Sequence, residues 1–183
     1  MRGTSIALGL ALAGVAHFAL AATPASPPPA PTIATQGKAV FMPGAAHLPD
    51  PNVRQRAVFN LTVAPASPAA TDPGLERVAR AVDLFTASGL PPGELDFVVL
   101  LSGGATDTAL DDSAYRARHG IANPNLGLVS QLSSAGVQLF VCGQALHARG
   151  LDSDLLAPGI AVSLSALTSV IQLQQQGYAL VPL

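Results

Sequence analysis

A regular alternation of strand-like and helix-like segments, running from residue 56 to the last residue given, limits what this sequence can fold into. One segment, 95–101, is apolar at nearly every position, which is typical of a parallel strand covered on both faces. The other strand-like segments are 57–63, 137–142, 160–164 and 178–181. Helix-like segments with short connections separate them, and crossovers between parallel strands are right-handed. This order predicts an α/β fold, a three-layer sandwich in which a mainly parallel sheet of about five strands has helices on both faces.

The helix-like segments begin at recognisable residues. Asp72-Pro73 provides an N-cap and a first-turn proline ahead of apolar residues at helical spacing. Asn123-Pro124-Asn125 is expected to cap a second helix, and Ser165 a last one. A short helix is expected over 145–149, directly after the third strand. The polar stretch around Tyr115 is left without an assigned element.

The first residues have the pattern of an export signal. Arg2 supplies a positive charge, 6–20 is an apolar run, and Ala19-Leu20-Ala21 is an A-x-A cleavage site. We expect cleavage before Ala22, which makes the protein periplasmic or secreted. Retention as an anchor is the alternative, because the run is close to the ~17-residue lower limit for a membrane span. The predicted organisation is signal peptide 1–21, Pro/Ala-rich linker 22–36, irregular lead-in 37–55 and one α/β domain 56–183.

The charge distribution excludes some classes of partner. Nine Lys and Arg residues and eleven Asp and Glu residues give a formal net charge of −2, and the basic residues are scattered. Binding to nucleic acid needs a basic patch that neutralises phosphates, so we expect none. Apolar runs after the signal stay below the ~18 residues of a membrane span, so we expect no membrane contact once the signal is cleaved.

Cys142 is the only cysteine of the chain, and it stands where the third strand ends and Gly143-Gln144 begins. One cysteine cannot close an intramolecular disulfide, so the thiol is free for other roles. At the carboxyl end of a parallel strand it would face the crevice where α/β sheets bind ligands, close to helix amides that stabilise a thiolate. The alternative is a buried packing residue. Cys142 is therefore the candidate catalytic residue.

A neighbouring strand ends at Ser102-Gly103-Gly104, and a crevice there would bring Cys142 near glycine amides. The alternative is a tight turn that binds nothing, since the segment has neither a Walker nor a dinucleotide-binding motif. Two tyrosines and an asparagine are further candidates, with core-edge and helix-capping roles as the alternatives. The candidate binding residues are Ser102, Gly103, Gly104, Tyr115, Asn123, Gly143, Gln144 and Tyr178. No metal or cofactor is predicted, because one Cys and separated His residues lack ligand-pair spacing.

Short motifs of the domain match a known family: Gly103-Gly104-Ala105-Thr106, Tyr115, Asn123-Pro124-Asn125, Ala135-Gly136-Val137, Val141-Cys142-Gly143-Gln144 and Gly177-Tyr178-Ala179. On these motifs the sequence from about 56 to 183 resembles the DsrE/DsrF-like family, specifically its exported single-domain members. The resemblance implies a flavodoxin-like α/β sandwich and self-assembly into homo-oligomers, commonly trimers or hexamers. In sulfur-relay members a cysteine in the corresponding region carries sulfane sulfur as a persulfide, and Cys142 alone matches that place. Exported relatives often have His-Gly where this chain has Ser102-Gly103.

Three hypotheses follow. The first is an exported sulfur carrier or sulfurtransferase-like protein in which Cys142 takes sulfur from a donor and passes it to an acceptor, with a donor or acceptor protein as partner. The second is a non-catalytic oligomeric binding or scaffold module with a buried thiol. The third is a cysteine hydrolase with His119 or His147 as the base that such a nucleophile requires.

Overall fold

The computed structural model describes Ile33 and residues 39–183. The predicted signal peptide, its cleavage site and all of the predicted linker except Ile33 lie outside the described residues. No helix in the described part of the chain is long and apolar enough to cross a membrane.

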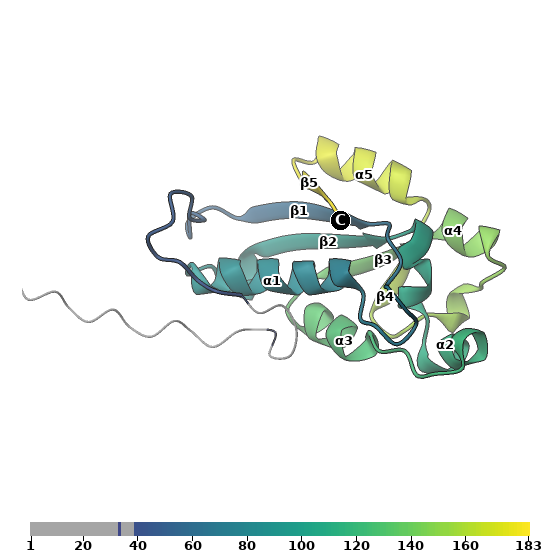
Figure 1. The fold of residues 1–183 in the computed structure, drawn as a ribbon. Helices are drawn as coiled ribbons and strands as arrows, with labels where there is room; N and C mark the ends of the chain where they lie inside the picture. The colour runs from purple at the N-terminus through teal and green to yellow at the C-terminus, as the bar shows by residue number, and fades with distance from the viewer. Residues whose placement is uncertain (1–32, 34–38) are drawn as a thin grey trace, which may run out of the picture.

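The centre of the domain is a sheet of five strands that all run in the same direction (Figure 1). Their order across the sheet is β4-β3-β2-β1-β5. The strands are β1 (Gln55–Leu61), β2 (Leu95–Leu101), β3 (Gln138–Cys142), β4 (Ile160–Ser163) and β5 (Ala179–Pro182). Each of the five strand-like segments of the sequence is one of these strands, and the predicted parallel α/β architecture is confirmed.

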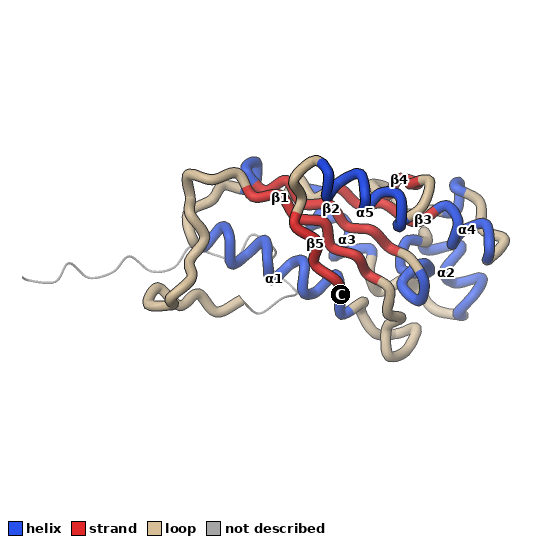
Figure 2. Tube along the Cα trace, turned by 90° about the horizontal axis from the view of Figure 1, so that it is seen from above, coloured by secondary structure: helices blue, strands red, loops and turns tan. Residues whose placement is uncertain are grey.

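Helices cover both faces of the sheet (Figures 1 and 2). The α-helices are α1 (Pro73–Ala87), α2 (Asp112–His119), α3 (Leu126–Ser134), α4 (Gly143–Ala148) and α5 (Ala166–Gln175). Three short 3₁₀ helices join them: η1 (Pro92–Glu94), η2 (Gly103–Ala109) and η3 (Ser153–Leu155). Helices α1 and α3 lie on one face, and α5 lies across the other, whereas α2 and α4 stand beyond the carboxyl ends of the strands.

Helix α2 and the 3₁₀ helix η2 occupy the polar stretch to which the sequence assigned no element. In α2 only Ala114 and Tyr115 are buried, so the apolar periodicity that announces a helix is weak. The local signals were at its ends. Asp111 caps the helix by accepting a hydrogen bond from the Ala114 N–H, and Gly120 ends it in the left-handed conformation, with φ 76°.

The two faces of the sheet have cores of very different size. On the α1 side, side chains such as Phe59, Leu75 and Leu101 belong to one large core. On the α5 side the buried set is small, and it consists of Val58, Val98, Leu100, Cys142 and Ala166. The α5 face is therefore the thinly covered one.

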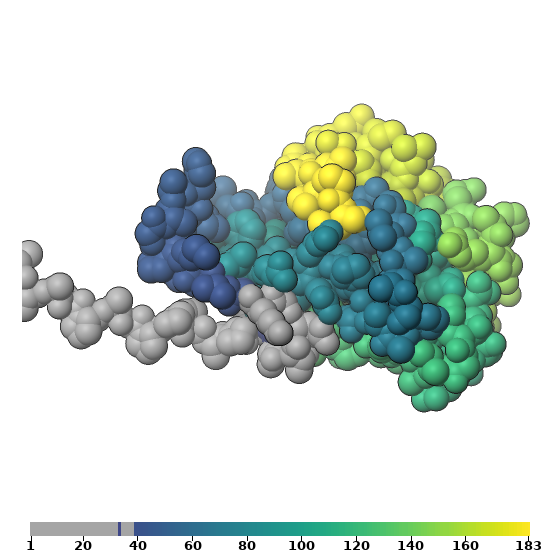
Figure 3. All heavy atoms as spheres, viewed as in Figure 1, coloured from purple at the N-terminus to yellow at the C-terminus, as the bar shows by residue number. Residues whose placement is uncertain are grey.

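The lead-in to the domain is irregular, and it lies at one end of the molecule (dark blue in Figure 3). Val40 and Met42 are 70% and 64% exposed, so they do not join the core. Ile33 does join it: the side chain is 1% exposed and packs in the α1-side core, and its N–H donates to the carboxylate of Asp83 on α1.

The α1-side core predicts a large cost for truncating its central strand. Leu101 is fully buried at the end of β2, so Leu101→Ala leaves a cavity and should lower the free energy of unfolding by about 3 kcal/mol. Denaturant unfolding measures this. Val53→Ala, at a 51% exposed position of the lead-in, is the matched control and should change stability by less than about 0.5 kcal/mol.

Candidate functional site

Cys142 is the last residue of β3 and the residue from which α4 starts. It pairs in register with Ser163, the last residue of β4. The side chain turns to the α5 face, where it is 6% exposed and packs in the small core. The sequence placed Cys142 at a strand's carboxyl end, and the structure shows that it is also a buried residue.

Two helices begin beside this thiol, α4 at Gly143 and α5 at Ala166. As a neutral thiol Cys142 makes no capping hydrogen bond to α4. The thiolate has four donors close by: the N–H groups of Ala166, Ala145 and Gln144 and the hydroxyl of Ser165. Burial alone raises the pKa of the Cys142 thiol, but these donors together lower the pKa by more, so its pKa lies below the ordinary value for cysteine.

Ser165 is the site residue that the sequence analysis understood only as a helix cap. Its Oγ accepts the N–H of Leu167 at 3.2 Å, which caps α5 as predicted. A hydroxyl that accepts one hydrogen bond keeps its own proton to donate, and here that proton can go to the Cys142 thiolate. The sequence held part of the information, because Ser165 follows the strand that pairs with the Cys142 strand. The order of the strands was also needed to place Ser165 beside Cys142.

Gly143 lies where α4 passes very close to β4. A Cβ at this position would be 2.9 Å from the carbonyl oxygen of Ser163 and 3.1 Å from the Cγ1 of Val162. A glycine is therefore required for the first turn of α4 to approach the neighbouring strand. Gln144 is exposed, and its Nε2 donates to the carbonyl oxygen of Leu164 at 3.3 Å, which ties the start of α4 to the segment before α5.

The loop Ser102-Gly103-Gly104 lies at the end of β2, next to β3, but its glycines are explained by packing. The N–H of Gly104 donates to the carbonyl oxygen of Thr62 at 2.8 Å, and a Cβ at Gly104 would be 2.5 Å from the backbone nitrogen of Ala64. Gly103 has φ +49°. The Gly104 amide is thus used within the protein, at the start of η2.

Tyr115 and Asn123 lie in other surroundings than Cys142. Tyr115 is on α2, where its hydroxyl donates to the carbonyl oxygen of Pro68 and its ring packs on His119 at a centroid distance of 4.4 Å. Both rings line a pocket of about 240 Å³ between α2 and the loop after β1, which Cys142 does not line.

Asn123 is the centre of a buried hydrogen-bond network. Its Nδ2 donates to the carbonyl oxygens of Leu110 and Thr108, and its Oδ1 accepts the N–H and the Nδ2 of Asn125. Asn125 Oδ1 in turn accepts the N–H of Asp72 at 2.7 Å. Every polar atom of the Asn123 side chain is thus satisfied by protein, which is what a residue that fixes a loop requires.

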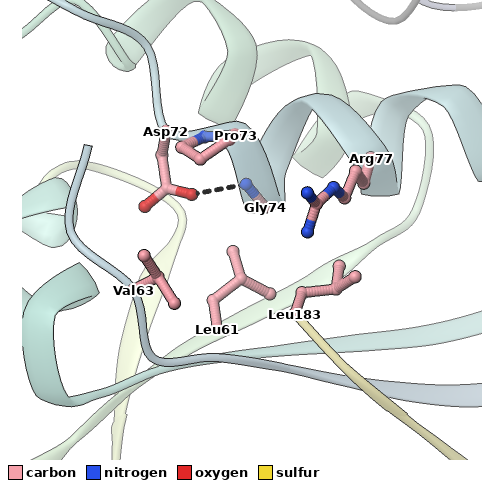
Figure 4. Close-up of a pocket in the computed structure, with 7 residues that line it drawn as sticks. All are labelled: Leu61, Val63, Asp72, Pro73, Gly74, Arg77 and Leu183. Carbon is pink, nitrogen blue, oxygen red and sulfur yellow. Dashed lines mark hydrogen bonds between the residues drawn. The ribbon is translucent and has the colours of Figure 1, made fainter. Parts of the chain in front are cut away.

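Asp72 connects this network to the start of α1. Its carboxylate accepts the Gly74 N–H at 2.8 Å and the Thr108 hydroxyl at 2.9 Å. Figure 4 shows the carboxylate and Gly74 facing Leu61 and Leu183 across a pocket of about 130 Å³. Burial raises the pKa of Asp72 and outweighs these hydrogen bonds. Stability from its neutral form is present below the unfolded-state pKa and is lost as the pH rises through the folded-state pKa.

The two histidines weighed as catalytic bases lie on α2 and α4. His119 pairs with Asp107, with 3.1 Å between Nε2 and Oδ2, and His147 is exposed on α4. Neither is among the groups that shift the pKa of Cys142. Among the described residues, no group of three or more His, Cys, Asp or Glu side chains is arranged to hold a metal ion.

Tyr178 lies in a groove of the α5 face, which has a volume of about 620 Å³ and which we call the α5 groove. Burial raises the pKa of the Tyr178 hydroxyl, and its hydrogen bond to Asp96 raises it further. The groove is lined by Val98, Leu100, Gln138, Phe140, Val162, Ser163, Leu164, Thr168, Ser169, Gln172, Leu173, Gln176 and Tyr178. It borders the thiol site through Leu100, which packs in the same small core as Cys142, and through Ser163, its register partner.

The sequence from 55 to 183 matches the model of the DsrE/DsrF-like family. The chain belongs to this family. Among solved structures, the DsrE-like fold is shared with the ychN protein from E. coli, at 18% identity and a TM-score of 0.53, over 70% of this chain and 99% of that one. A protein of unknown function, MTH1491 from Methanobacterium thermoautotrophicum, also matches, at 22% identity and a TM-score of 0.47, over 70% of this chain and 99% of that one.

No curated protein matches the chain. The predicted membership of the DsrE/DsrF-like family is confirmed, and with it a general link to sulfur relay. The likeness to the ychN protein shows the fold alone.

The donors around Cys142 predict how its titration responds to a substitution in this DsrE-like site. Ser165→Ala removes the hydroxyl donor, so the midpoint of thiolate formation, followed by ultraviolet absorbance against pH, should move to higher pH. Ser165→Thr keeps a hydroxyl and should restore the midpoint. Asp111→Ala removes a comparable cap from the distant α2 and controls for lost stability. Equal midpoints in Ser165→Ala and the unaltered protein would contradict the assignment.

The Asn123 network predicts a stability effect rather than a binding effect. Asn123→Ala leaves two carbonyl oxygens and two donors of Asn125 without their partner, so the free energy of unfolding should fall by about 3 kcal/mol. Chemical denaturation measures the loss. Asn52→Ala, at an exposed turn, is the control and should cost less than about 0.5 kcal/mol.

Proposed function

We propose that this chain is an exported sulfane-sulfur carrier that holds sulfur as a persulfide on Cys142. The observation that carries the proposal is the convergence of two helix starts, α4 and α5, on one cysteine at the carboxyl edge of a parallel sheet. Membership of a family that is linked to sulfur relay supports it. The same proposal includes self-assembly of the chain into a homo-oligomer. It also includes a separate protein that donates or accepts the sulfur.

The chemistry requires a thiolate twice. In loading, the Cys142 thiolate attacks the outer sulfur of a donor such as thiosulfate or a persulfide, the donor's S–S bond breaks, and sulfite or a thiolate leaves with the electron pair. In unloading, an acceptor thiolate attacks the terminal sulfur and the Cys142 thiolate leaves. The Ala166 and Ala145 N–H groups and the Ser165 hydroxyl stabilise this anion as attacking group and as leaving group.

One cysteine is enough for this cycle, because each step transfers a sulfur atom with no net change in oxidation state. A dithiol oxidoreductase would need a second, resolving cysteine, and the sequence holds one cysteine in all. A hydrolase would need a base beside the thiol, and the donors around Cys142 include no histidine. The donor set at Cys142 therefore suits a carrier better than either alternative.

Export is proposed on sequence grounds. The charge at Arg2, the apolar run 6–20 and the A-x-A site at 19–21 have the form of a cleavable signal. An exported location places the thiol in an oxidising compartment, where a lone cysteine without a disulfide partner is open to sulfur exchange.

A second candidate function is a binding or scaffold module whose thiol is inert. The observation that favours it is the exposed fraction of Cys142, which is 6%. A persulfide carrier must expose its sulfur to a donor, at least in short-lived openings of the segment between β4 and α5. A scaffold needs no such opening.

Sulfur loading separates the two functions. The protein incubated with thiosulfate or polysulfide should gain the mass of one or more sulfur atoms on Cys142, seen by intact-mass and peptide mass spectrometry, and dithiothreitol should remove it. Cys142→Ser should gain none.

Alkylation of the native protein shows whether Cys142 is accessible, and an inaccessible thiol would contradict the carrier function. If iodoacetamide modifies Cys142 only when denaturant is added, and no sulfur donor leaves an adduct, the thiol is inert and the scaffold function stands. If Cys142 is alkylated under native conditions and the adduct forms, the carrier function stands.

A further inference from the structure

Helix α5 lies across the sheet (Figures 1 and 2), and its first residue, Ala166, packs against Cys142. The two side chains belong to the same small core, where they are 7% and 6% exposed. The α5 groove lies next to this core, but neither Cys142 nor Ala166 lines it. The groove therefore does not reach the sulfur atom, and the start of α5 covers it.

This covering helix is weakly anchored. Of the ten residues of α5, Ala166 alone is buried, whereas Val170 and Leu173 are only partly buried against the small core. The side chain of Ala166 is one methyl group, so the buried anchor is small. A helix of about ten residues is marginal in water by itself, so α5 depends on this packing.

The other walls of the small core are firmer. Leu100 belongs to β2, which is hydrogen-bonded to β1 on one side and to β3 on the other. Gly143 starts α4 so close to β4 that a Cβ there would be 2.9 Å from the carbonyl oxygen of Ser163. The segment before α5 is held to α4 by an exposed hydrogen bond, 3.3 Å long, from Gln144 Nε2 to the carbonyl oxygen of Leu164.

We propose that a sulfur atom bound to Cys142 displaces the start of α5, so that the position of this helix differs between the empty and the loaded protein. A sulfur–sulfur bond is about 2.05 Å long, and a close-packed core takes no further atom without a shift of its walls. The wall that yields is the most weakly held one, which is α5. The inference rests on the proposed function, since it concerns the persulfide state of the same site.

The displacement changes what the site offers in each state. In the empty protein Ser165 and Ala166 cover the thiolate and donate hydrogen bonds to it. In the loaded protein these two donors move away with α5, while the N–H groups of Gln144 and Ala145 stay in place on α4. The terminal sulfur is then open to an acceptor, and the empty thiol is closed to oxidants. Loading thus regulates access to the site.

Methyl methanethiosulfonate tests the inference without a sulfur donor. The Cys142 thiolate attacks the sulfur that bears the methyl group, the S–S bond of the reagent breaks, and methanesulfinate leaves with the electron pair. The product carries CH₃S on Cys142 in place of the bound sulfur, and the chain has no other cysteine to label.

Hydrogen exchange then compares labelled and unlabelled protein. The amides of 167–175 should exchange at least about 10-fold faster in the labelled protein, because α5 has lost its anchor, while those of α1 keep their rates. Cys142→Ser treated with the same reagent should show no change. Circular dichroism and cooperative unfolding show that the labelled protein is folded.

A substitution of Gln144 tests which wall yields. Gln144→Ala removes the hydrogen bond to Leu164, so Cys142 should react with the reagent about fivefold faster. Gln55→Ala removes a similar bond, from its side-chain amide to the carbonyl oxygen of Val53, and should leave the rate unchanged. An unchanged rate in Gln144→Ala contradicts the assignment of α5 as the wall that yields.

Three results would overturn the inference. The first is a labelled protein whose α5 amides exchange as in the unlabelled protein, because the added group is then accommodated without a shift. The second is exchange that increases equally in α1, since the label then loosens the whole domain. The third is a Cys142 that reacts with the reagent only in denaturant.

Sulfur loading with thiosulfate or polysulfide keeps this result separate from the proposed function. If the methyl label accelerates exchange in α5 and no sulfur donor leaves an adduct on Cys142, only the carrier function fails. If Cys142 gains sulfur and α5 exchanges equally in the empty and the loaded protein, only the displacement fails.

Discussion

Parallel pairing of all five strands is the constraint on which the rest of the structure depends. Because every strand runs in the same direction, every strand ends at the same edge of the sheet, and the register then decides which residues meet there. The pairing of Cys142 with Ser163 brings the loop after β4 to the thiol, and α5 starts from that loop. A cysteine at the end of one strand is thereby surrounded by donors from two helices that are separate in sequence.

The carboxyl edge is held in shape by buried polar groups rather than by apolar packing alone. The chain of hydrogen bonds from Asp72 through Asn125 to Asn123 joins the start of α1 to the loop before α3. Thr108 connects both ends of this chain to η2. Buried networks of this kind specify one arrangement, because each member left without its partner carries a desolvation cost. The network does not include α5 or β4, so the thiol side of the edge is held by other hydrogen bonds, such as that from Gln144 to Leu164.

The sequence was sufficient to predict the helices and strands whose positions are determined by their own residues. The nearly all-apolar β2 was predicted with its observed bounds and α1 with its observed cap at Asp72, and the position of Cys142 at a strand end followed from the apolar run before it. The roles of residues that depend on contacts between distant segments could not be predicted from the sequence. Asn123 looks like a helix cap or a ligand contact until its partners Leu110 and Thr108 are placed around it, and Ser165 looks like a cap until β4 is placed beside β3.

The anchoring of Ile33 determines how the domain is presented to its surroundings. This residue packs in the core on the α1 side and its N–H donates to Asp83 on α1, whereas Cys142 is buried on the opposite face, beside the α5 groove. A segment that precedes Ile33 is therefore joined to the domain on its α1 side. The α5 face, on which Cys142 lies, is thus opposite to the face on which Ile33 is anchored.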